Sequence, residues 1–335
     1  MVLVTGGTGL VGSHLLLKLV SDNIEVRALY RTNEKLERVK KIFRYYSSNA
    51  NNLFEKIDWV KADILDIPSL ELAFIKVTHV YHCAAYISFN PSDFKLLERI
   101  NREGTANVVN MCIAFGVSKL CHVSTIGTIG RPISNEKATE ETEWSSQHTN
   151  PYAITKHLAE MEVWRGAQEQ LQIVIVNPGV ILGPGFWESG SGTFFKTAAK
   201  GYPFYPPGGS GFISVADVTR SMVNLMNSKI SGERFILVAN NLSYKEILGK
   251  ITSTMEKKAP NIELKMWQLQ LGKFADQIRN LLAGTPRTIT NSTIYGLQHP
   301  TKFDNSKAID TLKFEFEPLE ETIKFIAKLF IEEHS

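Results

Sequence analysis

Thr5-Gly6-Gly7-Thr8-Gly9-Leu10-Val11-Gly12 is the stretch that decides the fold of this chain. It directly follows the apolar residues 1–4, so it predicts a strand, a glycine-rich turn and the start of a helix. Gly6 permits the tight turn, Gly9 lets the main chain approach a pyrophosphate, and Gly12 allows the helix to pack on the strand. Because free N–H groups at a helix start hold anions, the stretch predicts a dinucleotide site.

The surrounding sequence has the pattern of a βαβ unit. Apolar residues recur at helical spacing over 10–19, and a second strand is predicted over 24–30. A glycine turn after a strand also occurs for packing alone, and this context favours the nucleotide site. Further apolar runs, separated by helical patterns, lie at 57–60, 77–83, 120–123 and 171–176. We therefore expect a doubly wound α/β fold with a parallel sheet covered on both faces.

The composition is that of an ordinary globular chain, with 335 residues of which 43% are hydrophobic. The formal net charge is +3 with both signs interspersed, which indicates neither nucleic-acid binding nor polybasic attachment to a membrane. The chain opens in a strand rather than a signal segment, and no apolar stretch is long enough to span a bilayer, so we expect a cytoplasmic protein. Cys83, Cys112 and Cys121 have no metal-ligand spacing, so we expect buried thiols in a reducing compartment and no metal site.

The composition changes after Gly183, where glycine, proline and aromatic residues become frequent. The length also exceeds the usual size of one domain. We expect residues 1–182, with a return to the same sheet near 212–240, to form a Rossmann-type nucleotide-binding domain. Residues 183–211 and 241–335 are expected to form a smaller substrate-binding region.

Two crossover helices are predicted, over 101–115 and 152–170. Asn150-Pro151 introduces the second, since proline suits the first turn of a helix. Tyr152 and Lys156 are four residues apart on this helix, so their side chains share one face. A phenol has an ordinary pKa of about 10, and an adjacent ammonium and a cationic nicotinamide ring both favour the phenolate.

The position of this pair gives it weight. It follows the hydroxyl-rich strand end 123–128, and ligands of open parallel sheets bind at the carboxyl ends of the strands. We therefore predict that a Ser or Thr hydroxyl orients a substrate carbonyl, that Tyr152 donates the proton, and that Lys156 also bonds the cofactor ribose.

Further motifs occur in order along nearly the whole chain. They are Asp63-Ile64, His82-Cys83-Ala84-Ala85, Asn101-Arg102-Glu103-Gly104-Thr105, Asn177-Pro178-Gly179-Val180-Ile181-Leu182-Gly183-Pro184 and Phe212-Ile213-Ser214-Val215-Ala216-Asp217-Val218. With the glycine stretch and the Tyr152/Lys156 pair, they make the chain resemble the extended short-chain dehydrogenase/reductase family, within the NAD-dependent epimerase/dehydratase superfamily. It resembles dihydroflavonol 4-reductase-like and 3β-hydroxysteroid dehydrogenase-like members more than sugar-nucleotide epimerases. The motifs are specific for the family and much less so for the substrate.

The resemblance implies roles for three of these motifs. Asp63 and Ile64 contact adenine, Ala84 and Ala85 line the cofactor cleft, and residues 178–181 flank the nicotinamide. Structural alternatives stay open for these residues. Asp63 would then cap the following segment, the two alanines would pack in the core, and Asn101 would cap its helix. The implied cofactor contacts from the sequence are Gly6, Thr8, Gly9, Leu10, Val11, Gly12, Asp63, Ile64, Ala84, Ala85, Tyr152, Lys156, Pro178, Gly179, Val180 and Ile181.

One departure from the family concerns the catalytic hydroxyl, because the usual serine is replaced here by Thr125. Its Oγ offers the same donor and acceptor, while the β-methyl stiffens χ1. The predicted catalytic set is therefore Thr125, Tyr152 and Lys156, with Ser124 as a second candidate for the hydroxyl.

The cofactor is predicted to be NADP(H), with NAD(H) left open. An NAD site normally has Asp or Glu about 20 residues beyond the glycines. Here that place reads Leu29-Tyr30-Arg31, and Arg31, together with Lys35, suits a 2′-phosphate. The alternative for Arg31 is an exposed charge at a strand end.

The predicted reaction is hydride transfer between nicotinamide and a carbonyl or secondary alcohol. Family dehydratases carry acidic residues after the catalytic hydroxyl, where this chain has Ile126 and Gly127. Family epimerases carry Arg and Asn before the Gly-Pro, where this chain has Asn177 and Val180. A nucleotide-sugar epimerase is the alternative, and a non-catalytic NADP-binding sensor is the third hypothesis.

Aromatic residues favour an apolar or aromatic small-molecule substrate. The candidate pocket residues are Ile87, Phe89, Phe186, Trp187 and Tyr205. No nucleic-acid or membrane partner is expected. The resemblance also implies a homodimer through helices around 94–115 and 151–170, although a monomer core explains the same apolar stripes.

Overall fold

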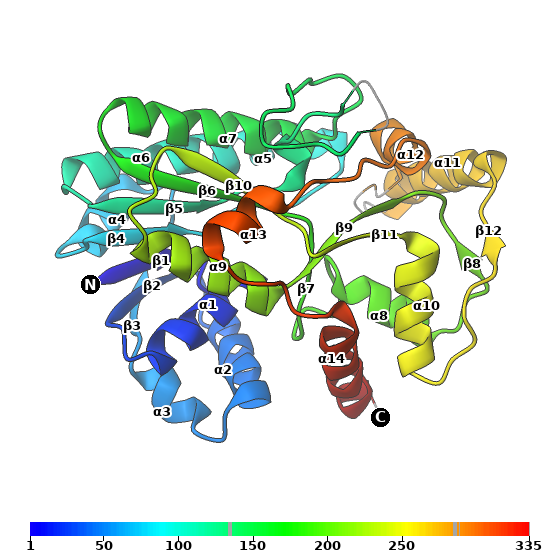
Figure 1. Ribbon diagram of the computed structural model, residues 1–335, viewed down its shortest axis with the longest axis horizontal. Coiled ribbons are helices and arrows are strands. Elements are labelled where there is room, and N and C mark those ends of the chain that lie inside the picture. The colour runs from blue at the N-terminus through cyan, green and yellow to red at the C-terminus, as the bar shows by residue number, and fades with distance from the viewer. Residues whose placement is uncertain (133–135, 284–286, 288, 335) are drawn as a thin grey trace.

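The computed structural model describes residues 1–132, 136–283, 287 and 289–334. Its centre is a seven-stranded parallel sheet in the order β10-β6-β5-β4-β1-β2-β3 (Figure 1). The strands are β1 (Val2–Thr5), β2 (Val26–Tyr30), β3 (Asp58–Lys61), β4 (His79–His82), β5 (Lys119–Val123), β6 (Gln172–Pro178) and β10 (Glu233–Leu237). Six of them fall on the predicted apolar runs, so the doubly wound α/β fold is confirmed.

Helices cover both faces of this sheet, as the continuous apolar strands require. One face packs against α1 (Leu10–Ser21), α2 (Glu34–Tyr46), α3 (Ala50–Glu55) and α9 (Val215–Asn227). The other face packs against α4 (Ile67–Phe74), α6 (Gly104–Ala114) and α7 (Pro151–Gln168). The two cores share the sheet and hold the carboxyl ends of its strands in fixed register.

The helical run predicted over 101–115 begins earlier than expected. It starts with the short η1 (Pro91–Asp93) and continues through α5 (Phe94–Leu97) and η2 (Glu98–Glu103) into α6. The segment η2 has π-helical geometry, so Asn101 lies inside the helical run and is not a helix cap. A short η3 (Ile126–Thr128) follows β5.

The remaining elements build a smaller region beyond the carboxyl ends of the strands (Figure 1). It holds a three-stranded sheet of β7 (Val180–Leu182), β9 (Gly209–Ser214) and β11 (Asn240–Ser243), and the pair β8 (Phe204–Tyr205) and β12 (Ile262–Glu263). Its helices are α8 (Gly192–Ala199), α10 (Tyr244–Thr254), α11 (Met266–Ala283), α12 (Asn291–Gln298) and α14 (Leu319–His334). The exception is α13 (Ser306–Leu312), which returns to the large sheet and packs against α9 and β10, with Ala308 buried in that core. A separate core joins α8, α10 and α14. In the described ranges, no helix is long and apolar enough to cross a membrane.

The last helix is tied to the first domain through one carboxylate. Glu333 on α14 accepts from Lys41 at 2.6 Å and from the Trp187 indole nitrogen at 2.8 Å. The Tyr45 hydroxyl donates to the same carboxylate. These donors lower the pKa of Glu333 against the opposing effect of burial, so the carboxylate stays charged.

Candidate active site

The glycine turn between β1 and α1 has a geometry that fits a pyrophosphate. Gly6 has a φ of +68°, and a Cβ atom there would lie 2.6 Å from the Ala84 nitrogen. A Cβ at Gly12 would lie 2.2 Å from the Gly6 oxygen. Gly9 is the N-cap of α1 and makes no side-chain capping bond. The first N–H groups of the helix, which have no acceptor in their own helix, therefore suit an anion. Also half-buried around this turn are Thr8, Leu10 and Val11.

A chain of buried hydrogen bonds runs from this turn to the helices behind the sheet. The Thr5 hydroxyl lies 2.7 Å from Nδ1 of His82, and Nε2 of His82 lies 2.9 Å from the Thr105 hydroxyl. Thr105 donates to the Asn101 carbonyl at 2.5 Å, so it accepts from His82, and the imidazole hydrogen is on Nε2. Burial, and then the Lys156 charge, lower the pKa of His82 to about 3, which keeps the ring neutral.

Asn101 fixes the loop after β4 to α7. Its side chain is fully buried; Oδ1 accepts from the Tyr86 nitrogen at 2.8 Å, and Nδ2 donates to the Tyr86 oxygen at 3.0 Å. The same Nδ2 lies 3.0 Å from the Thr155 hydroxyl. Asn101 therefore positions the loop that carries Ala84 and Ala85. π-Helical turns are often found at functional sites, and this role of η2 was not predicted from the sequence.

The segment that follows Thr125 packs against the start of α7 at the carboxyl end of β5. Thr125 caps η3 by accepting from the Gly127 nitrogen at 3.2 Å. Gly127 in turn lies against Ala153, since a Cβ added to Gly127 would come within 2.9 Å of the Ala153 Cβ. Ser124 is buried, and its hydroxyl lies 3.4 Å from Thr128. Thr125 is therefore the more accessible of the two candidate hydroxyls.

Helix α7 begins where the sequence predicted. Asn150 is its N-cap and accepts from the Ala153 nitrogen at 2.8 Å, with Pro151 in the first turn. Tyr152 follows at once and its ring meets Phe89 edge-on, with centroids 6.1 Å apart. Burial raises the pKa of Tyr152 to about 12.

Lys156 is almost completely buried one turn later. Its ammonium lies 3.1 Å from Nε2 of His122 and donates to the Val123 carbonyl at 2.9 Å. Burial lowers the pKa of Lys156 to about 8, partly offset by Glu160. The sequence predicted that this ammonium lowers the pKa of Tyr152. In the structure, the ammonium is directed at His122 and Val123 instead, and burial decides the pKa of the phenol.

A second buried cluster lies under the same strand ends. Glu160 on α7 accepts from Thr128 at 2.5 Å and from Asn177 Nδ2 at 2.6 Å, and Arg234 lies 3.6 Å from its other oxygen. Asn177 is fully buried in this cluster. Its amide therefore serves the protein interior rather than a substrate.

Arg31 and Asp63 lie at the ends of neighbouring strands. They form an exposed ion pair with 3.8 Å between Arg31 Nη1 and Asp63 Oδ2. Burial, then the charges of Arg31 and Arg38, lower the pKa of Lys35, so these three cations share one surface. Asp63 also accepts from the Leu65 nitrogen at 3.0 Å, a local turn contact of the kind that its alternative interpretation predicts.

The remaining cofactor candidates flank these groups. Ala84 is half-buried and donates from its nitrogen to Thr5, while Ala85 is exposed. Ile64 is buried against Gly104, where an added Cβ would meet its Cδ1 at 2.5 Å. The segment that was expected to flank a nicotinamide runs from the end of β6 into β7. It is Pro178, Gly179, Val180 and Ile181, of which the last three are half-buried.

The five pocket candidates do not gather at one place. Ile87 and Phe89 are 61% and 45% exposed on the loop after β4, and Phe89 contacts Tyr152. Phe186 packs under Arg38, at 4.9 Å from its ring centre, and Trp187 is buried against Phe330 of α14. Tyr205 is buried on β8. Local sequence does not reveal these partners, because α2 and α14 are distant in the chain.

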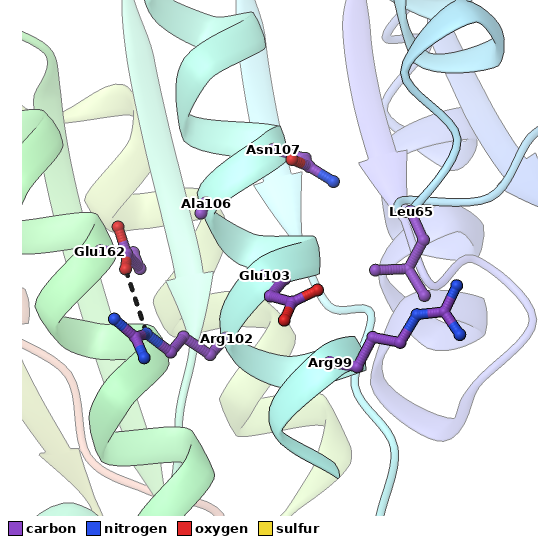
Figure 2. A pocket seen from close by; sticks show the side chains of 7 residues that line it. All are labelled: Leu65, Arg99, Arg102, Glu103, Ala106, Asn107 and Glu162. Carbon is purple, nitrogen blue, oxygen red and sulfur yellow. Dashed lines mark hydrogen bonds and ion pairs between the residues drawn. The ribbon is translucent and has the colours of Figure 1, made fainter. Parts of the chain in front are cut away.

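A polar hollow of about 550 Å³ lies between η2, α6 and α7 (Figure 2). Arg102 bridges to Glu162 across it at 3.4 Å, and Leu65 closes one side. Asn107, on its wall, donates to the Ile64 carbonyl at 2.9 Å. The hollow thus adjoins the segment expected to contact adenine, but it contains none of the catalytic candidates. Within the described ranges, no group of three His, Cys, Asp or Glu side chains is arranged to hold a metal ion.

Comparisons with known proteins agree with this fold. The model of the NAD-dependent epimerase/dehydratase family matches residues 2–237. A putative dihydroflavonol 4-reductase of Synechocystis is 27% identical over 319 residues, covering 92% of this chain and 88% of its own length. Sterol demethylase protein B of Methylococcus capsulatus is 28% identical over 251 residues, covering 73% of this chain and 72% of its own length. A crystal structure of UDP-glucose 4-epimerase from Thermotoga maritima has a TM-score of 0.77 at 20% identity, covering 100% of this chain and 99% of that one.

Proposed function

Because this chain belongs to the NAD-dependent epimerase/dehydratase family, we propose that it is an NADP(H)-dependent reductase or dehydrogenase acting on a carbonyl or secondary alcohol. Family membership makes it an enzyme of the NAD(P)-dependent oxidoreductase type. One observation supports the proposed reaction. Tyr152 lies beside the Thr125 segment at the end of β5, with the buried Lys156 one turn away on the same helix.

The proposed chemistry follows from the state of each group. When bound, the nicotinamide supplies or takes up a hydride. Tyr152, with its pKa of about 12, is protonated at neutral pH and is therefore suited to give a proton to a carbonyl oxygen. The Thr125 hydroxyl is suited to hold the same oxygen. Lys156, buried one turn away on the same helix, is suited to hold the ribose of the cofactor when it is bound.

An apolar or aromatic substrate fits the residues near Tyr152. Ile87 and Phe89 are exposed apolar side chains on the loop that Asn101 holds. A sugar diphosphate has less support, because the amide of Asn177 is engaged by Glu160. The names of the two relatives above, a reductase and a sterol-demethylating protein, agree with this substrate class.

The test is NADPH oxidation by the purified protein with aromatic, aliphatic and steroid-like ketones and aldehydes. Tyr152→Phe is expected to lower kcat at least roughly 100-fold, the low end for a general acid. Tyr202→Phe, at a tyrosine that is 51% exposed, should keep full activity. If UDP-sugars or GDP-sugars are isomerised without net cofactor use and no carbonyl is reduced, the protein is an epimerase. Cofactor binding without any turnover would indicate a sensor.

Cofactor choice has its own test at Arg31. Arg31→Ala should weaken NADPH binding roughly tenfold, since a hydrogen bond to a charged group contributes about 1.5–3 kcal/mol, and should leave NADH binding unchanged. The matched control is Arg44→Ala, which removes an exposed arginine near the C-terminal end of α2. Equal binding of NADH and NADPH by the unaltered protein would contradict the NADP(H) preference.

We also propose that the enzyme works in the reducing cytoplasm. Cys83, Cys112 and Cys121 are free thiols, and burial raises the pKa of each, which suits inert thiols rather than disulfides. The homodimer implied by the family stays a prediction for light scattering.

A further inference from the structure

Helix α11 exposes a continuous apolar stripe. Five large side chains recur at alternating spacings of four and three residues, which places them on one side of a helix. They are Trp267, Leu271, Phe274, Ile278 and Leu281, with exposed fractions of 60%, 58%, 62%, 41% and 83%. We call them the α11 stripe. Scattered exposed apolar residues are ordinary, but a contiguous row of this kind marks an interaction surface.

The stripe is largely exposed, and the opposite side of α11 attaches the helix to the fold. Leu269 and Asp276 are buried there. Asp276 accepts from Arg279 at 2.7 Å and from the Ile289 nitrogen at 3.0 Å, and Lys273 donates to Asn291 of α12 at 2.9 Å. The helix is therefore held on its inner side by Leu269 and Asp276 and on its flanks by Lys273 and Arg279, and it is apolar on its outer side.

The position of α11 leaves room for a large partner. It lies at the periphery of the smaller region, away from β2 and β3 (Figure 1). The strand that precedes it, β12, adds the exposed Ile262, and its partner β8 adds the exposed Phe204. These two strands thus carry further exposed apolar side chains of the same region.

Charge indicates what covers this surface. Residues 256–287 contain six basic and three acidic side chains, an excess equal to the +3 of the entire chain. On α11 itself, Lys273 and Arg279 fall on opposite flanks of the stripe. The one acidic side chain of α11, Asp276, is already engaged on the inner side. A second copy of α11 would set cations against cations, whereas an anionic surface complements them.

We propose that α11 docks on the surface of an anionic lipid bilayer, with the stripe inserted among the upper acyl chains and the cations at the headgroups. A helix with aromatic and leucine side chains on one side and cations on its flanks lies in the plane of the interface and does not cross it. The inference is independent of the proposed reaction, since docking needs neither cofactor nor turnover. Whole-chain composition did not indicate it because the excess charge is confined to one segment.

The test is sedimentation of the full-length protein with vesicles of phosphatidylcholine containing 30 mol% phosphatidylglycerol. We expect the protein to sediment with these vesicles, and to sediment less with pure phosphatidylcholine or in 0.5 M NaCl. Leu271→Ser/Phe274→Ser should lower the partition coefficient at least tenfold. Leu72→Ser/Leu96→Ser, which alters two exposed leucines on α4 and α5, should change it less than twofold.

A second measurement does not depend on the folding of the serine variants. Lipids brominated on the upper acyl chain should quench tryptophan emission of the unaltered protein, and Trp267→Phe should remove most of that quenching. The proposal is overturned if the unaltered protein stays in the supernatant with anionic vesicles, or if the Leu271/Phe274 variant binds equally well. It is also overturned if light scattering shows a dimer that this variant converts to monomer, because the stripe would then cover a second copy.

Discussion

His122 is one of the two groups that hold the Lys156 ammonium by a hydrogen bond. Its Nε2 accepts from the ammonium, so the ring hydrogen is on Nδ1, which has no partner in the described structure. Burial, the Lys156 charge and His82 together hold the pKa of His122 well below its ordinary value. The ring therefore stays neutral and accepts from Lys156 at every pH near neutrality.

This contact predicts a particular pH profile. For carbonyl reduction, kcat/KM should fall above a pH of about 8, as Lys156 loses its proton. His122→Phe removes the acceptor and should move this fall to lower pH by roughly one unit, because a hydrogen bond to a charged group contributes about 1.5–3 kcal/mol and one pKa unit is about 1.4 kcal/mol. His122→Gln, which restores an acceptor, should move it back. If kcat/KM falls at the same pH in the unaltered protein and in both variants, His122 does not set the charge of Lys156.

At the scale of the element, α1 depends on having no side chain at Gly12. Gly12→Ala should abolish cofactor binding and destabilise the protein by roughly 2–4 kcal/mol, since its Cβ would lie 2.2 Å from a main-chain oxygen. Gly249 in α10 is the matched control because nothing lies within 4 Å of an added Cβ. Gly249→Ala should stabilise by about 0.5–1 kcal/mol. Urea unfolding and cofactor titration measure both effects, and equal stabilities of the two variants would contradict the geometry.

The elements also show what the sequence predicts and what it leaves out. Apolar runs predicted the strands and Asn150-Pro151 predicted the start of α7, because strand burial and helix capping are local. The π turn of η2 was missed, since it depends on how Asn101 meets Tyr86 and Thr155. The i, i+4 spacing predicted that Tyr152 and Lys156 share a face, but not that Lys156 bonds His122. That contact depends on which side of β5 packs against α7.

At the scale of the whole molecule, buried histidines make stability depend on pH. Burial lowers the pKa of His14 to about 4 and that of His82 to about 3, and it also lowers the pKa of His122. Above a pH of about 6.5 these groups are neutral in both the folded and the unfolded chain. Below this pH the histidines of the unfolded chain bind protons, whereas those of the folded chain do not. The free energy of unfolding therefore decreases as the pH falls.

The predicted loss is roughly 2 kcal/mol for each of the three histidines at pH 5, measured as a lower urea midpoint than at pH 7. His14→Gln should reduce the difference between the urea midpoints at pH 7 and pH 5. His299→Gln, at an exposed histidine, should leave it unchanged. A urea midpoint that is the same at pH 7 and pH 5 would contradict the conclusion that these histidines are buried as neutral imidazoles.

The carboxylate of Glu333 has a consequence for how the chain is made. Its partners Lys41, Tyr45 and Trp187 leave the ribosome long before it does. At about 5–20 residues per second, roughly 15–60 s separate the synthesis of Tyr45 from that of Glu333. During biosynthesis α2 therefore lacks its Glu333 contacts until α14 has emerged from the ribosome.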